Sequence, residues 1–441
     1  MQSLDFFIFL LNNVVEFVII NICFFLILFC LLKNRLLAGV LDPLFLILVV
    51  GFSTKYSIVV FLYLHDLISL KLLLMVLIYA LILILFFTFF SKNKLNSFFA
   101  ILIKAIAEKN DGKHVYIICL LLYFFISIFI LFNIGFGILA DTNRFENSRG
   151  FGAFVRVLDL LSVFIIAFST VNISNLRKKQ NKIFFSLILC LFILFSALIN
   201  GAKISILFGF MTVFFVLKLN DRNFDISIKK IALGISLGVT FMVVGLTINM
   251  KNNGENINQS SEHISGVPIV GEKFINRMVS NGNTAYLILP YDIIDKLATD
   301  NFITRMFTPI IGITQMSKIV GYNAGDYSVG RQALLYHDNG ATVAGGPTSH
   351  FDFFSYVNLG LVGGGIFVAF IGAVLGNLQN EIQLYSRKSH KNNFLTAIYT
   401  TVWFRGVILI VEPSVGFAYL FDVFVILILI SSSTLLLRKS H

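Results

Sequence analysis

Charge, proline and tryptophan are scarce in this chain of 441 residues, which has six prolines and one tryptophan. Only 13% of its residues are charged, whereas about a quarter of the residues of a soluble domain are charged. Hydrophobic residues make up 57% of the chain and include 49 Phe. These shares exclude a soluble enzyme, a disordered chain and a fibrous repeat, and they leave an integral membrane protein.

Cysteine and the common catalytic motifs are also scarce or missing. The four cysteines, Cys23, Cys30, Cys119 and Cys190, all lie inside apolar runs and have no CxxC spacing, so we expect small core side chains. The sequence has no Walker A, HExxH or GxSxG motif and no paired Cys/His pattern. We therefore expect neither a metal centre nor a cofactor.

Long, continuous apolar runs dominate what is present. A membrane-spanning helix needs about 20 mainly apolar residues, whereas a barrel strand alternates over about ten. The runs therefore predict an all-α polytopic membrane protein with about eleven spans. They lie near residues 13–32, 36–53, 70–90, 115–138, 153–174, 183–199, 204–219, 231–248, 354–376, 394–411 and 419–437.

Basic residues cluster after alternate spans, beginning with Lys33 and Arg35 and ending with Arg438 and Lys439. Since basic loops stay in the cytoplasm, the clusters predict an external N-terminus and a cytoplasmic C-terminus. The same excess accounts for the formal net charge of +11 without a nucleic-acid partner. The start of the chain lacks the basic region of a signal peptide, so the first run is expected to remain as a span.

Residues 53–70 admit two interpretations. Lys55, His65 and Asp66 interrupt their apolar character, which favours an external interfacial helix. The alternative is a short additional span, which would also change the assignment of the first span.

One long segment stands out on the external side. It divides the chain into a bundle of about eight spans (1–248), a long periplasmic loop (249–353) and about three C-terminal spans (354–441). The charges of the acidic and basic residues in this loop nearly cancel, and the loop contains four of the six prolines. Residues 275–294 and 302–320 have helical apolar spacing and are expected to lie along the membrane surface. No internal repeat is visible, which disfavours a transporter.

Charged residues near the outer face are few, and each has a functional and a structural interpretation. Arg144 and Arg149 suit a bidentate clamp for a phosphate or pyrophosphate, or they reach to lipid headgroups as interfacial anchors. Arg156 and Asp159 have the spacing of a helical ion pair. Lys203, alone in a tight turn, is a further phosphate ligand or an interfacial anchor.

The long loop contributes three arginines to the same list. Arg277 and Arg305 lie on amphipathic segments, where a solvated polar face is the structural alternative to substrate binding. Arg331 follows Gly330, which frees the backbone to approach a ligand.

Candidate acids and bases lie at the mouths of the late spans. His350 suits a base or a hydrogen-bond donor, although a lone His at a helix start is also a common structural residue. Asp352 follows it, and Ser349 is the expected N-cap of the ninth span. Glu412 either contacts Arg405 or faces the external site. The glycines between residues 360 and 376 are typical of a span packed closely inside the bundle.

These features together carry a family resemblance. The many spans, the long late loop and GGPTSHFDFFSYVNLGLVGGG (residues 345–365) resemble the Wzy-type O-antigen (oligosaccharide repeat-unit) polymerases. SVGRQALL (residues 328–335), followed by a His before the span, also resembles the related O-antigen ligases, where an Arg and a His of this loop are held essential. NRFENSRGFG and NGAKISIL are looser similarities, and relatives often carry Arg in place of Lys203.

The resemblance implies a metal-independent glycosyltransferase of the bacterial inner membrane with its site facing the periplasm. A glycan on undecaprenyl pyrophosphate is transferred to a new lipid-linked repeat unit, and the family implies a separate chain-length regulator protein. Pyrophosphate departure needs cations, for which Arg331, Arg144 and Arg149 are the first choices. His350 orients or deprotonates the acceptor hydroxyl, with Asp352 or Glu412 behind it.

Two alternatives remain open at this stage. A ligase shares the chemistry and differs in its acceptor, but Phe351 follows His350 where the ligases carry a His-Asn pair. A lipid-linked oligosaccharide flippase belongs to another class, and the long loop argues against it.

Overall fold

The computed structural model describes residues 3–92, 98–107, 112–135, 150–201, 204–221, 266–341, 345–388 and 391–439, with scattered residues between 224 and 264. The described part is helical throughout, with one isolated extended bridge between Ser260 and Pro268. A helix is what these apolar runs must form in lipid, because it satisfies every backbone donor and acceptor internally.

Nine of the described helical segments are long and apolar enough to cross a membrane. The chain is therefore an all-α, multi-pass membrane protein. The nine are α2 (Val14–Leu32), η2 and α3 (Phe45–Gly51 and Phe52–Leu64), α4 (Leu70–Phe90), α6 (Lys113–Asn133), α8 (Gly152–Ser174), α9 (Lys179–Asn200), α17 (His350–Ser386), α18 with α19 (Asn393–Gly406 and Ile408–Val411) and α20 (Pro413–Lys439). The apolar helix α10 (Ile204–Asn220) is shorter, and only part of the predicted span 231–248 lies within the described residues. The short α1 (Ser3–Asn12), η1 (Gly39–Leu41) and α5 (Phe98–Ala107) complete this part.

The second span differs from the prediction. It runs over residues 45–64 instead of 36–53, so the interfacial helix predicted within residues 53–70 is wrong. Lys55, whose charge argued against a span, is fully buried and paired with a carboxylate from a distant part of the chain. A tertiary ion pair lets a lysine lie in a membrane helix. The sequence around Lys55 does not indicate which distant carboxylate will be its partner.

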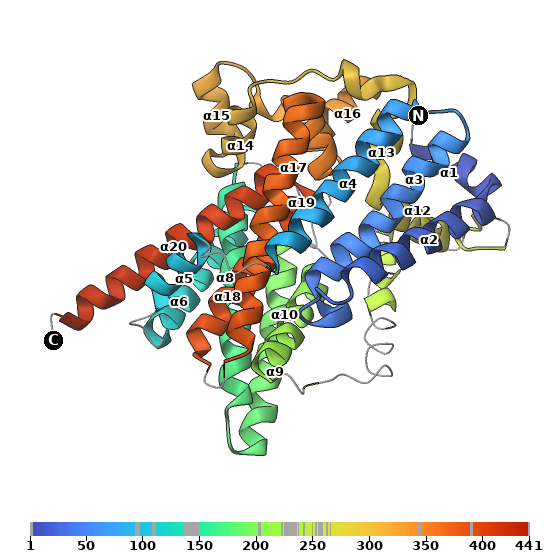
Figure 1. The fold of residues 1–441 in the computed structure, drawn as a ribbon. Helices are drawn as coiled ribbons and strands as arrows, with labels where there is room; N and C mark the ends of the chain where they lie inside the picture. The colour runs from blue at the N-terminus through green and yellow to red at the C-terminus, as the bar shows by residue number, and fades with distance from the viewer. Residues whose placement is uncertain are drawn as a thin grey trace.

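The long loop is a series of short helices from residue 269 onward. They are α12 (Ile269–Val279), η4 (Ser280–Gly282), α13 (Asn283–Ile288), η5 (Pro290–Lys296), α14 (Phe302–Ile311), α15 (Ile313–Val320), η6 (Ala324–Tyr327) and α16 (Val329–His337). This confirms the helical spacing read in the two segments. Figure 1 shows α13, α14, α15 and α16 gathered at one end of the bundle, around the top of α17. Ile303, Ile313 and Ile319 remain exposed on α14 and α15, as expected of amphipathic helices.

The helix α17 is not straight but consists of two helices that fold against each other. Gly360 has φ 68° and ψ −173°, a conformation outside the helical range that glycine adopts without a steric penalty. The ring centroids of Phe354 and Phe367 are 6.1 Å apart, although residues thirteen positions apart in a straight helix are separated by about 20 Å. A Cβ on Gly364 would lie 2.9 Å from the carbonyl of Ser355. Residues 350–359 therefore run back along residues 361–386 as a helical hairpin.

Glycines allow the second arm of this hairpin to pack on α4, which lies beside it in Figure 1. A Cβ at Gly372 would lie 2.7 Å from the carbonyl oxygen of Leu83, and one at Gly376 would lie 2.5 Å from that of Phe87. The predicted close packing is confirmed on this face. The opposite face is exposed, however, so the prediction that the span avoids lipid is wrong there; the exposed side chains are Leu361, Val362, Ile366 and Phe370.

Candidate functional site

The first arm of the hairpin begins with a buried ion pair. Lys55 Nζ donates to both carboxylate oxygens of Asp352, and both side chains are 0% exposed. The ring centroids of Phe353 and Phe52 lie 4.1 and 4.9 Å from the ammonium nitrogen. Lys55 lies just beyond the π-helical η2, a type of helix that is frequent at functional sites. Asp352, a candidate acid or base in the sequence, is thus neutralised by a lysine.

His350 lies beside this pair with one ring nitrogen uncommitted. Its side chain is buried, and Nε2 is 3.2 Å from the hydroxyl of Thr348. Nδ1 has no hydrogen-bond partner within the described residues. The backbone φ of 53° is uncommon for a residue other than glycine and marks local strain. Such a nitrogen is chemically able to accept or donate a proton once a substrate group reaches it.

Glu412, which lies between α19 and α20, reaches the same turn. Its two carboxylate oxygens accept hydrogen bonds from the Ser349 N–H at 2.8 Å and from the Ser349 hydroxyl at 2.6 Å. Of the two alternatives for Glu412, the contact with Arg405 is replaced by one with Ser349. Ser349 occupies the predicted N-cap position, but its hydroxyl donates to Glu412 instead of capping the helix.

The structure thus brings together the three predicted acid–base candidates, His350, Asp352 and Glu412. With Lys55 and Ser349 they form what we call the hairpin-base cluster. In this cluster Asp352 has a cation as partner, Glu412 has neutral donors, and His350 keeps a free nitrogen. His350 is therefore the group best placed for proton transfer, with Glu412 behind it.

The turn before His350 packs against α16. A Cβ on Gly330 would lie 1.8 Å from the Pro347 carbonyl oxygen, and one on Gly346 would lie 2.3 Å from the Gly330 carbonyl. The close approach predicted at Gly330 is real, but the protein's own backbone makes it instead of a ligand. Thr284 on α13 donates to the Thr348 carbonyl at 2.6 Å and holds the turn from the other side.

Arg331, on the helix that packs on this turn, is ordered by contacts within the long loop. Its Nε lies 3.3 Å from an oxygen of Asp326, and its Nη2 donates to the Ala341 carbonyl at 2.6 Å. Arg331 lies on α16, the helix that packs on the turn leading into His350.

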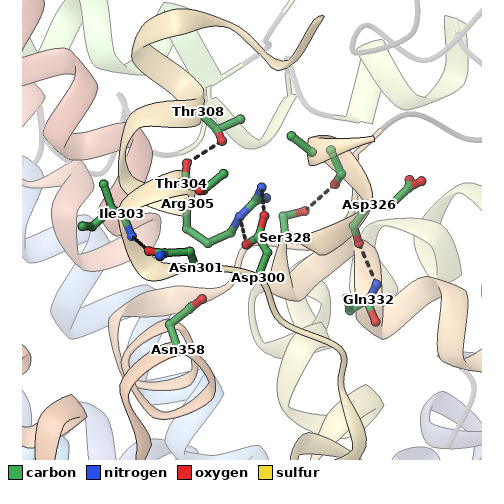
Figure 2. Close-up of polar contacts among 12 residues, drawn as sticks. Asp300, Asn301, Ile303, Thr304, Arg305, Thr308, Asp326, Ser328, Gln332 and Asn358 are labelled. Atoms are coloured by element: carbon green, nitrogen blue, oxygen red, sulfur yellow. Dashed lines mark hydrogen bonds and ion pairs between the residues drawn. The ribbon is translucent and has the colours of Figure 1, made fainter. Parts of the chain in front are cut away.

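Arg305 and Arg277 behave differently from each other. Figure 2 shows the guanidinium of Arg305 directed at the carboxylate of Asp300; Nη2 donates to Oδ2 at 2.6 Å, and Tyr322 donates to the same oxygen at 2.9 Å. Arg305 is 5% exposed, so the structural alternative of a solvated side chain does not hold for it. Its ion pair with Asp300 stabilises the start of α14. Burial, followed by the nearby Asp300 carboxylate, raises the pKa of Tyr322. Arg277 is exposed in the last turn of α12, as a solvated residue would be.

A second polar cluster joins α8 to the C-terminal helices. Arg156 pairs with Asp422 on α20 and donates to the carbonyls of Pro309 and Ile310 on α14. The predicted pair between Arg156 and its helix neighbour is therefore wrong, because a cross-bundle carboxylate is available.

That neighbour, Asp159, has partners from other spans. It accepts from the hydroxyl of Tyr419 at 2.7 Å and from the amide of Asn200. Arg405 donates to the Asp159 carbonyl and lies 4.7 Å from the Tyr419 ring centroid. Since each charge has a partner or an acceptor here, the cluster fits a structural role in joining α8, α9, α18 and α20.

Three predicted phosphate-binding residues, Arg144, Arg149 and Lys203, lie outside the described residues. Sequence reasoning missed Lys55 and Asp422 as members of polar clusters. Both are charged residues inside apolar runs, and this could have pointed to them. An ionisable residue within a membrane span usually has a function or a charged partner. Within the described residues, no group of three His, Cys, Asp or Glu is arranged to hold a metal ion.

Comparison of the chain with models of protein families, with curated proteins and with solved structures finds no match.

Proposed function

We propose that this protein polymerises oligosaccharide repeat units carried on undecaprenyl pyrophosphate, at the periplasmic face of the bacterial inner membrane. One observation carries the proposal: the contact of Gly330 with Pro347 seats the helix of Arg331 on the turn that leads into His350. The Arg and the His that the family resemblance singles out thus come from adjoining elements over the hairpin-base cluster.

The proposed reaction forms one glycosidic bond and breaks one bond to phosphate. The acceptor hydroxyl oxygen attacks the anomeric carbon of the donor glycan, and the bond from that carbon to pyrophosphate breaks. The hydroxyl proton passes to His350 Nδ1, and undecaprenyl pyrophosphate leaves with the bonding electron pair. Because negative charge develops on the leaving group, Arg331 and the proposed Arg144 and Arg149 would stabilise the transition state.

The assignment of the remaining groups follows from their partners. Asp352 is ion-paired with Lys55, so His350 is the first choice for the base. Glu412 accepts both of its hydrogen bonds from Ser349 and supports the turn that holds His350. No step requires a metal ion or a nucleotide sugar.

The protein's surface fits a substrate that stays in the membrane. Exposed apolar residues run along the lipid-facing sides of the spans, including Leu361 and Ile366 of the hairpin. Arg156 ties the end of α14 to α8 through the Pro309 carbonyl, so the long loop is anchored next to the spans. A polyprenyl chain in the bilayer would thus bring its pyrophosphate to the level of the loop.

The decisive experiment compares surface and lipid-linked glycans from a strain lacking the gene, with and without the gene restored. A polymerase predicts loss of the ladder, with one repeat unit still attached to the lipid A–core. Loss of every repeat unit, with polymer accumulating on undecaprenyl pyrophosphate, would instead indicate a ligase. Loss of every repeat unit without that polymer would indicate a flippase, and an unchanged pattern would contradict a role in this polysaccharide.

A further inference from the structure

The hairpin formed by residues 350–359 and 361–386 needs something to hold its first arm. The contacts of this arm with the second arm are apolar or involve backbone, as at Phe354 with Phe367 and at Ser355 with Gly364. At its base, however, lie polar groups: His350 with a free nitrogen, and Asp352, whose carboxylate is fully buried. An arm with a buried carboxylate at its base is stable only where that charge is compensated.

Lys55 supplies that compensation from another span. The pair joins residues 297 positions apart, both fully buried and surrounded by aromatic rings. A buried pair in such a setting fixes geometry, since moving either partner leaves an uncompensated charge inside the membrane. The position of Asp352 therefore sets the position of His350, which is two residues away in the same turn.

We infer that the Lys55–Asp352 pair is a latch that holds residues 350–359 folded back in the bundle, and that Lys55 is a positioning residue for His350. Lys55 acts through Asp352 and the turn before it, not by touching the substrate. The inference deepens the proposed function and rests on it for the consequence on activity. The latch itself is a property of the fold and is measurable without any substrate.

The experiment first measures the latch directly. Cys23, Cys30, Cys119 and Cys190 are replaced by serine or alanine, and Ser355→Cys is introduced as a reporter, because Ser355 is fully buried against Gly364. Labelling of the purified protein in detergent by N-ethylmaleimide is followed over time. Lys55→Met is expected to speed the labelling of this cysteine by about tenfold or more, because the arm opens when Asp352 loses its cation.

A matched exchange at an exposed pair serves as control. Glu16 on the preceding span lies 3.2 Å from His65, and its side chain is 41% exposed. Glu16→Gln is expected to leave the labelling rate unchanged, because exposed pairs contribute little. Rapid labelling in both variants, or slow labelling in both, would overturn the latch.

A double variant separates positioning from chemistry. In Lys55→Met/Asp352→Leu the buried pair is replaced by apolar side chains, a change that folds of this kind tolerate. We expect slow labelling to return and polymer synthesis to recover to within about tenfold of the parent, whereas Lys55→Met alone loses about 10²-fold through misplacement of His350. Slow labelling with no recovery of polymer would mean that Lys55 or Asp352 takes part in the chemistry, which overturns the positioning role.

The two proposals fail in distinguishable ways. If the gene is not required for polymerisation, the labelling of the purified protein still tests the latch. If the labelling contradicts the latch, the polymer ladder of the deletion strain still tests the polymerase.

Discussion

Lys55 donates to both carboxylate oxygens of Asp352 across 297 positions of sequence, and the two side chains have no exposed surface. This relationship links the second span to the start of the helical hairpin. It also gives Asp352 a buried cation as partner, whereas His350 Nδ1 has no hydrogen-bond partner in the described part of the chain.

His350→Ala is expected to lower polymer formation by at least about 10²-fold, because a positioned base typically contributes that much. Protein abundance is measured by immunoblot and polymer length by gel. His263→Ala, at a histidine that contacts Glu272 in the long loop, is the matched control and is expected to leave polymer length unchanged. Polymer of normal length in His350→Ala would reduce His350 to a structural residue.

Arg331→Ala is expected to lower polymer formation by about 10²–10³-fold at normal abundance, because it removes a charge that stabilises the leaving pyrophosphate. Lys318→Ala, at an exposed lysine of the same loop with no proposed role, is the control and is expected to have little effect. Asp326→Asn separates the alternatives, since Asp326 contacts Arg331 but has no proposed chemical role. An equal loss in Asp326→Asn would show that Arg331 acts by ordering the loop.

Gly330→Ala is expected to reduce both polymer and folded protein, because its Cβ would lie 1.8 Å from the Pro347 carbonyl oxygen. The helix of Arg331 and the turn before His350 would then have to separate. Gly340→Ala is the control, since a Cβ there meets only the Asp338 side chain at 3.4 Å. Size-exclusion chromatography in detergent measures the folded fraction. A fully active Gly330→Ala protein would contradict the close contact of the two elements.

Asp422→Asn is expected to lower the free energy of unfolding by about 3–5 kcal/mol, because it leaves the nearly buried Arg156 without its carboxylate. Asp295→Asn, which breaks the exposed pair with Lys71, should cost at most about 1 kcal/mol. Thermal unfolding of the purified variants in detergent gives the comparison. Similar losses in the two variants would mean that the Arg156 pair contributes no more than a surface pair.

Asp42, in the loop between α2 and η2, predicts a dependence of stability on pH. Burial raises the pKa of Asp42 from 3.8 to about 6, and hydrogen bonds from the Trp403 indole and the Leu44 and Leu37 amides oppose this only in part. The folded carboxyl thus holds its proton more tightly than the unfolded one. Its contribution to stability is greatest below pH of about 4, decreases as the pH rises to about 6 and is then constant; a shift of this size corresponds to about 3 kcal/mol.

Asp42→Asn is expected to remove that dependence. Unfolding temperatures of the variant and the parent, measured in detergent between pH of about 4 and 8, would differ by an amount that changes across this window. Asp66→Asn, at an exposed aspartate, should follow the parent at every pH. Parallel curves for Asp42→Asn and the parent would contradict the raised pKa.

Much of the architecture was predictable because it depends on local pattern. A run of about 20 apolar residues must be helical in lipid whatever surrounds it, so most spans and the long loop were readable in advance. The glycines of residues 360–376 likewise predicted close helix packing. Gly372 and Gly376 pack closely against α4.

The candidate site was predictable only as a set of residues. The sequence named His350, Asp352 and Glu412, but each partner lies elsewhere in the chain: Lys55 for Asp352 and Ser349 for Glu412. Arg156 shows the same limit, since its nearest carboxylate in sequence was the expected partner and a carboxylate 266 positions away is the real one.

Composition and hydropathy by themselves determined that this protein is helical and crosses the membrane many times. Each apolar run of sufficient length forms a helix in lipid independently of the others. Tertiary structure decided that residues 350–359 fold back at Gly360, that Lys55 lies within a span, and which acids meet which cations. The physical reason is that a buried charge is stable only beside its partner, and that partner is chosen by the packing of distant helices and not by neighbouring sequence.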